Sequence, residues 1–227
     1  MAIGSYDIML SDFFRRINSA NRSETYARHN RKTTVLNAAN RKYAANHGFE
    51  APRTTIIYPS KKSVPGKIII AVDTSGSISD DKMETGRIVG EILRTTVNSN
   101  HWEDRDVEII YCGTRLRKDG PFKASSAELD AYIEKIKKNG IKVSDCDTDL
   151  LPIWKNIIRE SESANGYPFG LVFVTGAETL NDDKIVELYK SGEFQVPTMI
   201  ICPEGKSLSE SFIELSDENS SFEIGVI

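Results

Sequence analysis

The sequence predicts an α/β fold, in which a doubly wound and mostly parallel sheet follows a basic, helical N-terminal extension. Three observations indicate this fold class. Short apolar runs alternate with amphipathic stretches from Lys67 onward, which is typical of parallel strands connected by helices. The first of these runs, 68–72, stops at a carboxylate that is followed by hydroxyl side chains. Before Lys67 the chain is polar and basic, and it lacks the alternation.

The alternation predicts the elements of a domain that spans residues 67–227. We expect strands at 67–73, 107–112, 170–175, 197–202 and 221–227. We expect amphipathic helices at about 80–98, 126–138, 150–162, 181–191 and 207–215. The stretch from Thr114 to Phe122 predicts a hairpin or an edge strand, because Asp119-Gly120 is a turn dipeptide.

Residues 1–66 form the predicted extension. Within 6–20 the apolar side chains recur at helical spacing, so one helix face should dock on the core of the sheet through Ile8, Phe13, Phe14 and Ile17. The stretch 21–52 is polar, basic and rich in Asn and Ala, which fits either a helix packed across the domain or a partly mobile arm. A connector with several prolines follows, and 54–58 reads as a possible short strand.

The composition of the chain limits which functions and locations are compatible with it. The 227 residues include 39% apolar residues, which is enough for a core, and no apolar run approaches the length of a membrane span. Without a signal-peptide pattern at the N-terminus, we expect a cytoplasmic protein. Residues 1–67 carry 12 basic against 4 acidic residues, a net charge of +8, and the remaining 160 carry 17 against 29, a net charge of −12. The basic part can therefore cover the chain's own acidic surface, or contact nucleic acid or an acidic partner.

Cysteines and histidines are few and dispersed. The three cysteines form no Cys-x-x-Cys pair and the three histidines form no His-Glu-x-x-His motif, so neither zinc nor a disulfide framework is indicated. We interpret Cys112 and Cys202 as buried strand thiols. A Gly-x-x-x-x-Gly-Lys-Ser/Thr motif is also absent, which excludes a P-loop ATPase activity for this chain.

The strand run 68–72 leads into Asp73-Thr74-Ser75-Gly76-Ser77. Mg²⁺ and similar hard cations prefer oxygen ligands and keep several waters, so one carboxylate with two hydroxyls in a short turn leaves coordination positions open. Gly76 allows the turn to fold tightly. A helix cap at Ser77 or Ser79 explains one hydroxyl, but not a carboxylate and several hydroxyls together.

This motif resembles the metal-ion-dependent adhesion site of the von Willebrand factor A family, whose first loop is Asp-x-Ser-x-Ser. The resemblance covers residues 67–227 and implies a Rossmann-like A fold that binds Mg²⁺ or Mn²⁺. By that resemblance Thr148 is the ligand of the second loop and Asp149 also matches, although acids and a cysteine replace the usual glycines. The same acids also fit the first turn of the following helix. In the third loop Gly176 stands where the family has an Asp, which weakens the site, and Asp147 or Glu178 are candidates to compensate through water.

The wider resemblance is to the A-like domain of predicted bacterial metallopeptidase-like proteins, with similar stretches at Tyr26 to Lys32 and at Tyr58-Pro59-Ser60. The peptidase part itself is absent. The resemblance implies a noncatalytic module in which Ser75, Ser77 and Thr148 hold the ion directly, while Asp73 and Asp149 act largely through water. A partner's Asp or Glu then completes the coordination shell. Intracellular relatives work as adaptors of MoxR-type or chelatase-type AAA+ ATPases, so such an ATPase or its client is the implied partner.

Two alternatives remain open. The extension has basic side chains for phosphates and tyrosines for base stacking, so nucleic-acid (RNA) binding with the A domain as scaffold is the second hypothesis. Its candidate residues are Arg15, Arg16, Arg22, Arg28, Arg31, Lys32, Arg41 and Lys42. The third hypothesis is a metal-assisted hydrolase that uses Asp145, Asp147 and Asp149. It ranks last, because no His or Lys near these loops is placed for proton transfer.

Overall fold

The computed structural model describes residues 5–20, 22–29, 31–48, 59–63, 66–75, 81–98, 105–112, 116–142, 149–161, 168–176, 180–203 and 208–226. The chain divides into two compact units. The larger, which we call the sheet unit, consists of Met1–Ile17 and Pro65–Ile227, and the smaller, the basic unit, consists of Asn18–Val64. This division places most of the first helix with the sheet, whereas the sequence-based boundary lies between residues 66 and 67. That boundary stays a prediction, and the packing of α1 in the first core implies that a cut there would expose part of this core.

The sheet unit is built on six strands in the order β5-β4-β3-β6-β7-β8. The strands are β3 (Ile68–Asp73), β4 (Asp106–Cys112), β5 (Arg117–Lys123), β6 (Gly170–Val174), β7 (Thr198–Cys202) and β8 (Phe222–Val226). Neighbouring strands run parallel except β4 and β5, which are antiparallel. The chain order reverses between β3 and β6, and ligands of doubly wound sheets bind at the carboxyl ends of the strands at such a point.

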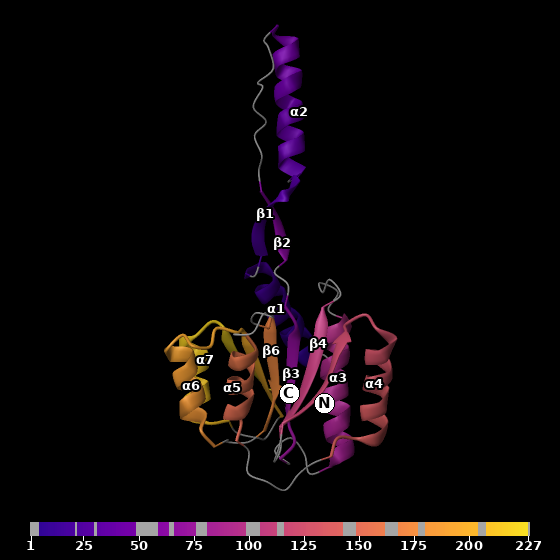
Figure 1. Ribbon diagram of the computed structural model, residues 1–227, viewed down its shortest axis with the longest axis vertical. Helices are drawn as coiled ribbons and strands as arrows, with labels where there is room; N and C mark the ends of the chain where they lie inside the picture. Colours follow the sequence, from indigo (N-terminus) through magenta and orange to yellow (C-terminus); the bar gives the residue numbers. More distant parts are fainter. Residues whose placement is uncertain are drawn as a thin grey trace. The chain divides into compact units, whose positions relative to one another are not determined.

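Helices cover both faces of this sheet, as the sequence predicts. Figure 1 shows α3 (Lys82–Asn98) and α4 (Ala127–Asn139) on one side of the strands, and α5 (Leu151–Glu160), α6 (Asp182–Lys190) and α7 (Glu210–Glu218) on the other. Residues of each strand alternate between the two faces, so β3 contributes Ile68, Ile70 and Val72 to the first core and Ile69 and Ala71 to the second. The result is two apolar cores separated by one sheet.

The first helix, α1 (Ser5–Ala20), completes the first core. Its buried side chains are Leu10, Phe13, Phe14 and Ile17, which pack in the same cluster as strand residues of β3, β6 and β7. Glycines on the sheet leave the helix room, because a Cβ on Gly170 would lie 2.9 Å from Cδ1 of Ile17. The predicted contact through Ile8 is wrong. That side chain is 65% exposed, since it lies off the face formed by the four buried residues.

The basic unit holds a two-stranded antiparallel ribbon and one long helix. Strand β1 (Arg22–His29) pairs with β2 (Pro59–Ser63), and α2 (Arg31–Asn46) lies between them in sequence. The helix falls in the stretch where the sequence allows a helix or an arm. The possible strand at 54–58 lies outside the described residues. Within the ranges that the structure describes, no helix is both long enough and apolar enough to cross a bilayer.

Candidate metal site at the carboxyl end of the sheet

Asp73 is the last residue of β3 and is only 1% exposed. Both of its carboxylate oxygens accept hydrogen bonds. Oδ1 accepts the backbone N–H of Ser75 at 2.9 Å, and Oδ2 accepts the hydroxyl of Thr175 at 2.9 Å. Because Thr175 follows β6, the two central strands jointly orient this carboxylate. Outer contacts of this kind hold ligands in place in metal sites.

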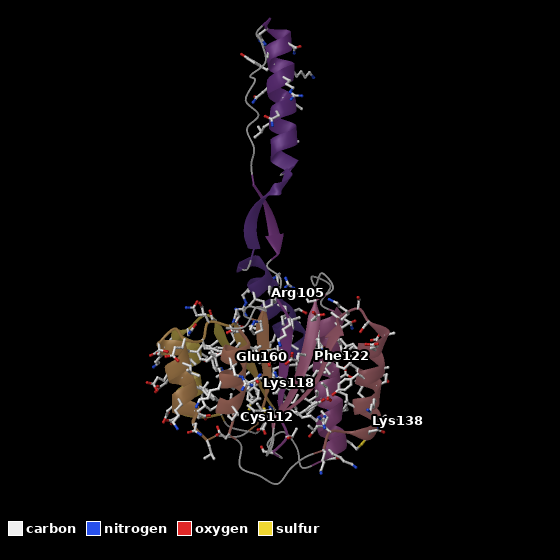
Figure 2. The ribbon with its side chains drawn as sticks, in the orientation of Figure 1. Arg105, Cys112, Lys118, Phe122, Lys138 and Glu160 are labelled. Atoms are coloured by element: carbon white, nitrogen blue, oxygen red, sulfur yellow. The ribbon has the colours of Figure 1, made fainter. Side chains whose placement is uncertain are left out.

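Thr74 ties the same turn to the neighbouring strand β4. Its backbone N–H and its hydroxyl both donate to the carbonyl oxygen of Cys112, at 2.7 Å and 2.5 Å. Cys112 is the register partner of Asp73 and ends β4 at the same edge (Figure 2). Burial, and then the negative charge of Asp73, raise the pKa of the Cys112 thiol well above its usual range. Cys112 and Cys202 are buried strand thiols, as the sequence predicts.

Asp149 reaches the same edge from the segment before α5. It forms an isolated parallel bridge with Leu180, which lies just before α6 and after β6. Its Oδ1 accepts the backbone N–H of Leu151, the first residue of α5, at 3.1 Å. Asp149 therefore sits at a helix N-terminus, where its charge is favourable. The capping interpretation places the acids at the N-cap or in the first turn, but Leu150 is the N-cap and the first turn contains no acid, so Asp149 lies one residue before the cap.

Thr175 is the site residue that sequence reasoning missed. Its side chain is fully buried, and its hydroxyl reaches across to β3, 102 positions away in the chain. The signal available in the sequence is a hydroxyl directly after a buried strand, just before Gly176. Since the carboxyl ends of parallel strands share one edge, that hydroxyl belongs at the same edge as Asp73.

The structure describes three of the predicted metal-site residues, namely Asp73, Ser75 and Asp149. The remaining predicted ligands and compensating acids, which are Ser77, Thr148, Asp147 and Glu178, lie outside the described residues. The described donors are carboxylate and hydroxyl oxygens, and these fit a hard divalent cation. Within the described ranges, no three His, Cys, Asp or Glu side chains gather closely enough to hold a metal. The oxygen atoms available at this edge therefore come from the hydroxyls of the turn after β3 and from the oriented carboxylate of Asp73.

The predicted phosphate-binding residues separate between the two units. Arg15 and Arg16 lie on α1 in the sheet unit, where Arg15 pairs with Asp12 at 2.9 Å and Arg16 pairs with Glu223 of β8. These ion pairs give both arginines carboxylate partners within the sheet unit. The basic unit contains the other six predicted residues, which are Arg22, Arg28, Arg31, Lys32, Arg41 and Lys42. Of these, Arg41 and Lys42 have described side chains, and both are exposed.

Comparison with known proteins gives likenesses in structure but not in sequence. No protein-family model matches the chain, and no curated protein matches it. A von Willebrand factor type A structure from Catenulispora acidiphila is 12% identical, with a TM-score of 0.51, over 74% of this chain and 40% of that one. The sheet unit has the von Willebrand factor A fold. This confirms the predicted fold class, and at such identity the likeness concerns the fold alone.

Two further structures resemble this A fold less closely. Proximal thread matrix protein 1 from the mussel byssus is 15% identical over 71% of this chain and 44% of that one, with a TM-score of 0.49. The SpRpn10 VWA domain is 13% identical over 72% of this chain and 88% of that one, with a TM-score of 0.48. The match to this chain thus spans less than half the length of the Catenulispora acidiphila protein and of the mussel protein.

Proposed function

We propose that the sheet unit is a noncatalytic protein-interaction module that binds a partner's carboxylate through Mg²⁺ or Mn²⁺ at the carboxyl ends of β3 and β6. The observation that supports it best is the buried carboxylate of Asp73, which the Ser75 N–H and the Thr175 hydroxyl orient at 2.9 Å each. Burying a carboxylate is costly unless it is paired or serves a metal. A bound divalent ion would supply an open coordination position for one anionic oxygen.

The residues proposed to hold the ion come from two loops. Ser75, Ser77 and Thr148 would bind it through their hydroxyls, and Asp73 and Asp149 would act largely through water. Gly176 offers no carboxylate where the resemblance implies one. We therefore expect weak metal binding, with Asp147 or Glu178 as the acids that compensate.

More specifically, we propose that the protein is an intracellular adaptor that binds a MoxR-type AAA+ ATPase or its client. This proposal rests on the resemblance of the Asp73-to-Ser77 turn to the adhesion-site motif, and the fold found for the sheet unit is compatible with it. A MoxR-type ATPase gene adjacent to the gene of this protein would support the adaptor role independently of metal binding.

Isothermal titration calorimetry with Mg²⁺ and Mn²⁺ tests the metal site. The parent protein should bind one ion, and Ser77→Ala should weaken binding because it removes a proposed ligand. Ser79→Ala is the matched control, since it removes a hydroxyl from the same loop but outside Asp-x-Ser-x-Ser. If the parent shows no binding at millimolar metal, or if both variants bind like the parent, the proposal is refuted.

A further inference from the structure

The basic unit carries a charge opposite to that of the rest of the chain. Its 47 residues, Asn18–Val64, include 9 Lys and Arg against 2 Asp and Glu, a net charge of +7. The sheet unit has 20 basic against 31 acidic residues, a net charge of −11. Helix α2 contains four basic residues and no acidic one. A helix of this composition is electrostatically complementary to a polyanion.

One face of α2 exposes large apolar and aromatic side chains. Val35 is 59% exposed, Leu36 is 41% exposed and Tyr43 is 62% exposed. Leu36 and Tyr43 are seven positions apart, so they lie on one face, and Val35 and Lys42 form the adjoining row at the same spacing. Val35 and Lys42 point away from Ala44, which is only 6% exposed and marks the covered side. We call Val35, Leu36, Lys42, Tyr43 and His47 the α2 stripe.

The aromatic ring of the stripe is held in a fixed position. The rings of Tyr43 and His47 stack with their centroids 4.2 Å apart and their planes 24° apart. Nδ1 of His47 is 2.9 Å from the carbonyl oxygen of Tyr43, to which a protonated Nδ1 donates, so the histidine is anchored to the last turn of the helix. A ring that is both exposed and held loses little conformational entropy when another flat group stacks on it.

We propose that the α2 stripe binds single-stranded nucleic acid, with Tyr43 stacking on an unpaired base and Lys42 contacting the backbone phosphates. The charge of the basic unit favours a polyanion, and the exposed ring favours one whose bases are accessible. A membrane surface fits less well, because helices that insert into bilayers need a broad face of Trp, Phe and Leu, and α2 contains one Leu and neither Trp nor Phe. This inference is independent of the proposed metal site.

The proposal distinguishes two neighbouring cations on the same helix. Lys42 belongs to the stripe, whereas Arg41 is two positions before Tyr43 and thus points to a different side of the helix. Both side chains are exposed. Removing Lys42 should therefore weaken binding more than removing Arg41, although each change lowers the net charge equally.

Fluorescence anisotropy of the full chain with labelled single-stranded RNA tests the inference. The same titration with single-stranded DNA of the same sequence shows whether the stripe prefers RNA or DNA. Tyr43→Ala should weaken binding roughly 5- to 150-fold, the loss expected for one stacked base, and Tyr43→Phe should keep most of the affinity. Lys42→Ala should lower the slope of log affinity against log salt by roughly 0.7, as for one phosphate on a single strand. Arg41→Ala should have the smaller effect on affinity.

Lys138→Ala is the matched control, because it removes an exposed lysine from α4 in the sheet unit (Figure 2). Circular dichroism of each variant verifies that the helices persist. Three results would overturn the inference: equal binding of duplex and single strand, equal loss for Lys138→Ala and Lys42→Ala, or unchanged affinity in Tyr43→Ala. Stripe-dependent binding to phosphatidylserine vesicles or to a second copy of the chain, without binding to single strands, would assign the stripe to another partner.

Discussion

The hydroxyl of Thr175 donates a hydrogen bond to Oδ2 of Asp73 across the boundary between β6 and β3. The donor and acceptor are 2.9 Å apart, and both residues are almost completely buried. This contact lies at the point where the strand order reverses. It fixes the carboxylate at the position where a doubly wound sheet binds its ligands, and so it connects the fold directly to the proposed site.

Thr175→Val should therefore reduce both stability and metal affinity. The change keeps the shape of the side chain but removes the hydrogen bond to a buried carboxylate, which costs about 1.5–3 kcal/mol of unfolding free energy. Loss of an outer contact should weaken metal binding by roughly 10- to 100-fold. Urea unfolding and calorimetry measure the two effects. Thr175→Ser keeps the hydroxyl and should stay much closer to the parent, whereas equal losses in both variants would show that packing, not the hydrogen bond, matters.

A second prediction concerns the charge network of Lys67, which directly precedes β3, with residues of β4, β5 and α5. Oε2 of Glu160 is 2.9 Å from Nζ of Lys67, and its other oxygen pairs with Lys118 (Figure 2). Burial alone would raise the pKa of Glu160, but hydrogen bonds from the two lysines outweigh it and lower the pKa from 4.5 to about 2. A folded-state pKa below the unfolded value means that the carboxylate stabilises the fold above pH 4.5, and that this contribution is lost as the pH falls towards 2.

The parent's unfolding free energy should accordingly decrease between pH 4.5 and about pH 2, and Glu160→Gln should show a flatter pH dependence in this window. Glu214→Gln on α7 is the control, because it removes an exposed carboxylate elsewhere. Urea unfolding at several pH values measures the slopes. Parallel curves for the parent and Glu160→Gln would show that the network does not couple to folding.

The glycines of α3 give a third prediction. A Cβ on Gly86 would lie 2.4 Å from the carbonyl oxygen of Ile136 on α4, a backbone atom that cannot move without shifting the helix. A Cβ on Gly90 would instead meet the flexible side chain of Lys137 at 2.6 Å. Alanine favours helix by about 1 kcal/mol over glycine in both places. Gly86→Ala should thus destabilise the protein by about 1–3 kcal/mol through overpacking, and Gly90→Ala should cost clearly less, because the side chain of Lys137 can change rotamer whereas the backbone of α4 cannot.

Thermal and urea unfolding of the two glycine variants provide the measurement. Each variant serves as the control for the other, because the substitution, the helix and the propensity gain are the same. Equal stabilisation of both would mean that α3 and α4 are less closely packed than these distances indicate.

A fourth prediction follows from the place of α1 in the first core. Phe13 is 1% exposed and packs with residues of the sheet, whereas Ile8 on the same helix is 65% exposed. Phe13→Ala should cost about 3–5 kcal/mol of unfolding free energy, and Ile8→Ala should stay within about 0.5 kcal/mol of the parent. Urea unfolding distinguishes them. A chain that begins at Lys67 loses this helix and should lose cooperative unfolding, and a stable truncated domain would show that the sheet does not need it.

The sequence predicts the five parallel strands well because each contains a short and mostly apolar run, whereas the polar edge strand β5 is indicated only by its turn dipeptide. Strand β4, for example, is predicted at 107–112 and observed at Asp106–Cys112. Strand β1 is missed because Arg22–His29 is polar, and its pairing with β2 places it in a ribbon and not in an apolar core. Helical periodicity predicts the apolar face of α1, and the docking of Phe13, Phe14 and Ile17 on the sheet is confirmed. The sequence does not show that Ile8 lies outside this contact, because neighbouring apolar positions can fall on different sides of the helix.

The candidate site is predictable to the extent that it is local in sequence. Asp73 and Ser75 belong to one turn, so their spacing alone indicates a metal site. The contact of Asp73 with Thr175 depends on which strand lies beside β3, and a pattern within one segment carries no such information. The register of β3 with β6 supplies it, because this pairing brings the carboxyl ends of the two strands together.

The last prediction is that partner binding requires both the metal and the hydroxyls of the first loop. A divalent ion attracts a single anionic oxygen strongly, and the acidic sheet unit repels carboxylates that miss the open coordination position. Metal and partner should each tighten the other's binding by the same factor. Capture from a lysate of the source cells, with Mg²⁺ or with EDTA, tests this on the parent, on Ser75→Ala/Ser77→Ala and on Ser79→Ala. The parent and Ser79→Ala should retain the partner in Mg²⁺ alone, and the double variant should not retain it in either condition. A partner that is retained equally by all three proteins in EDTA would show that recognition uses another surface, and loss of that binding at high salt would point to the basic unit.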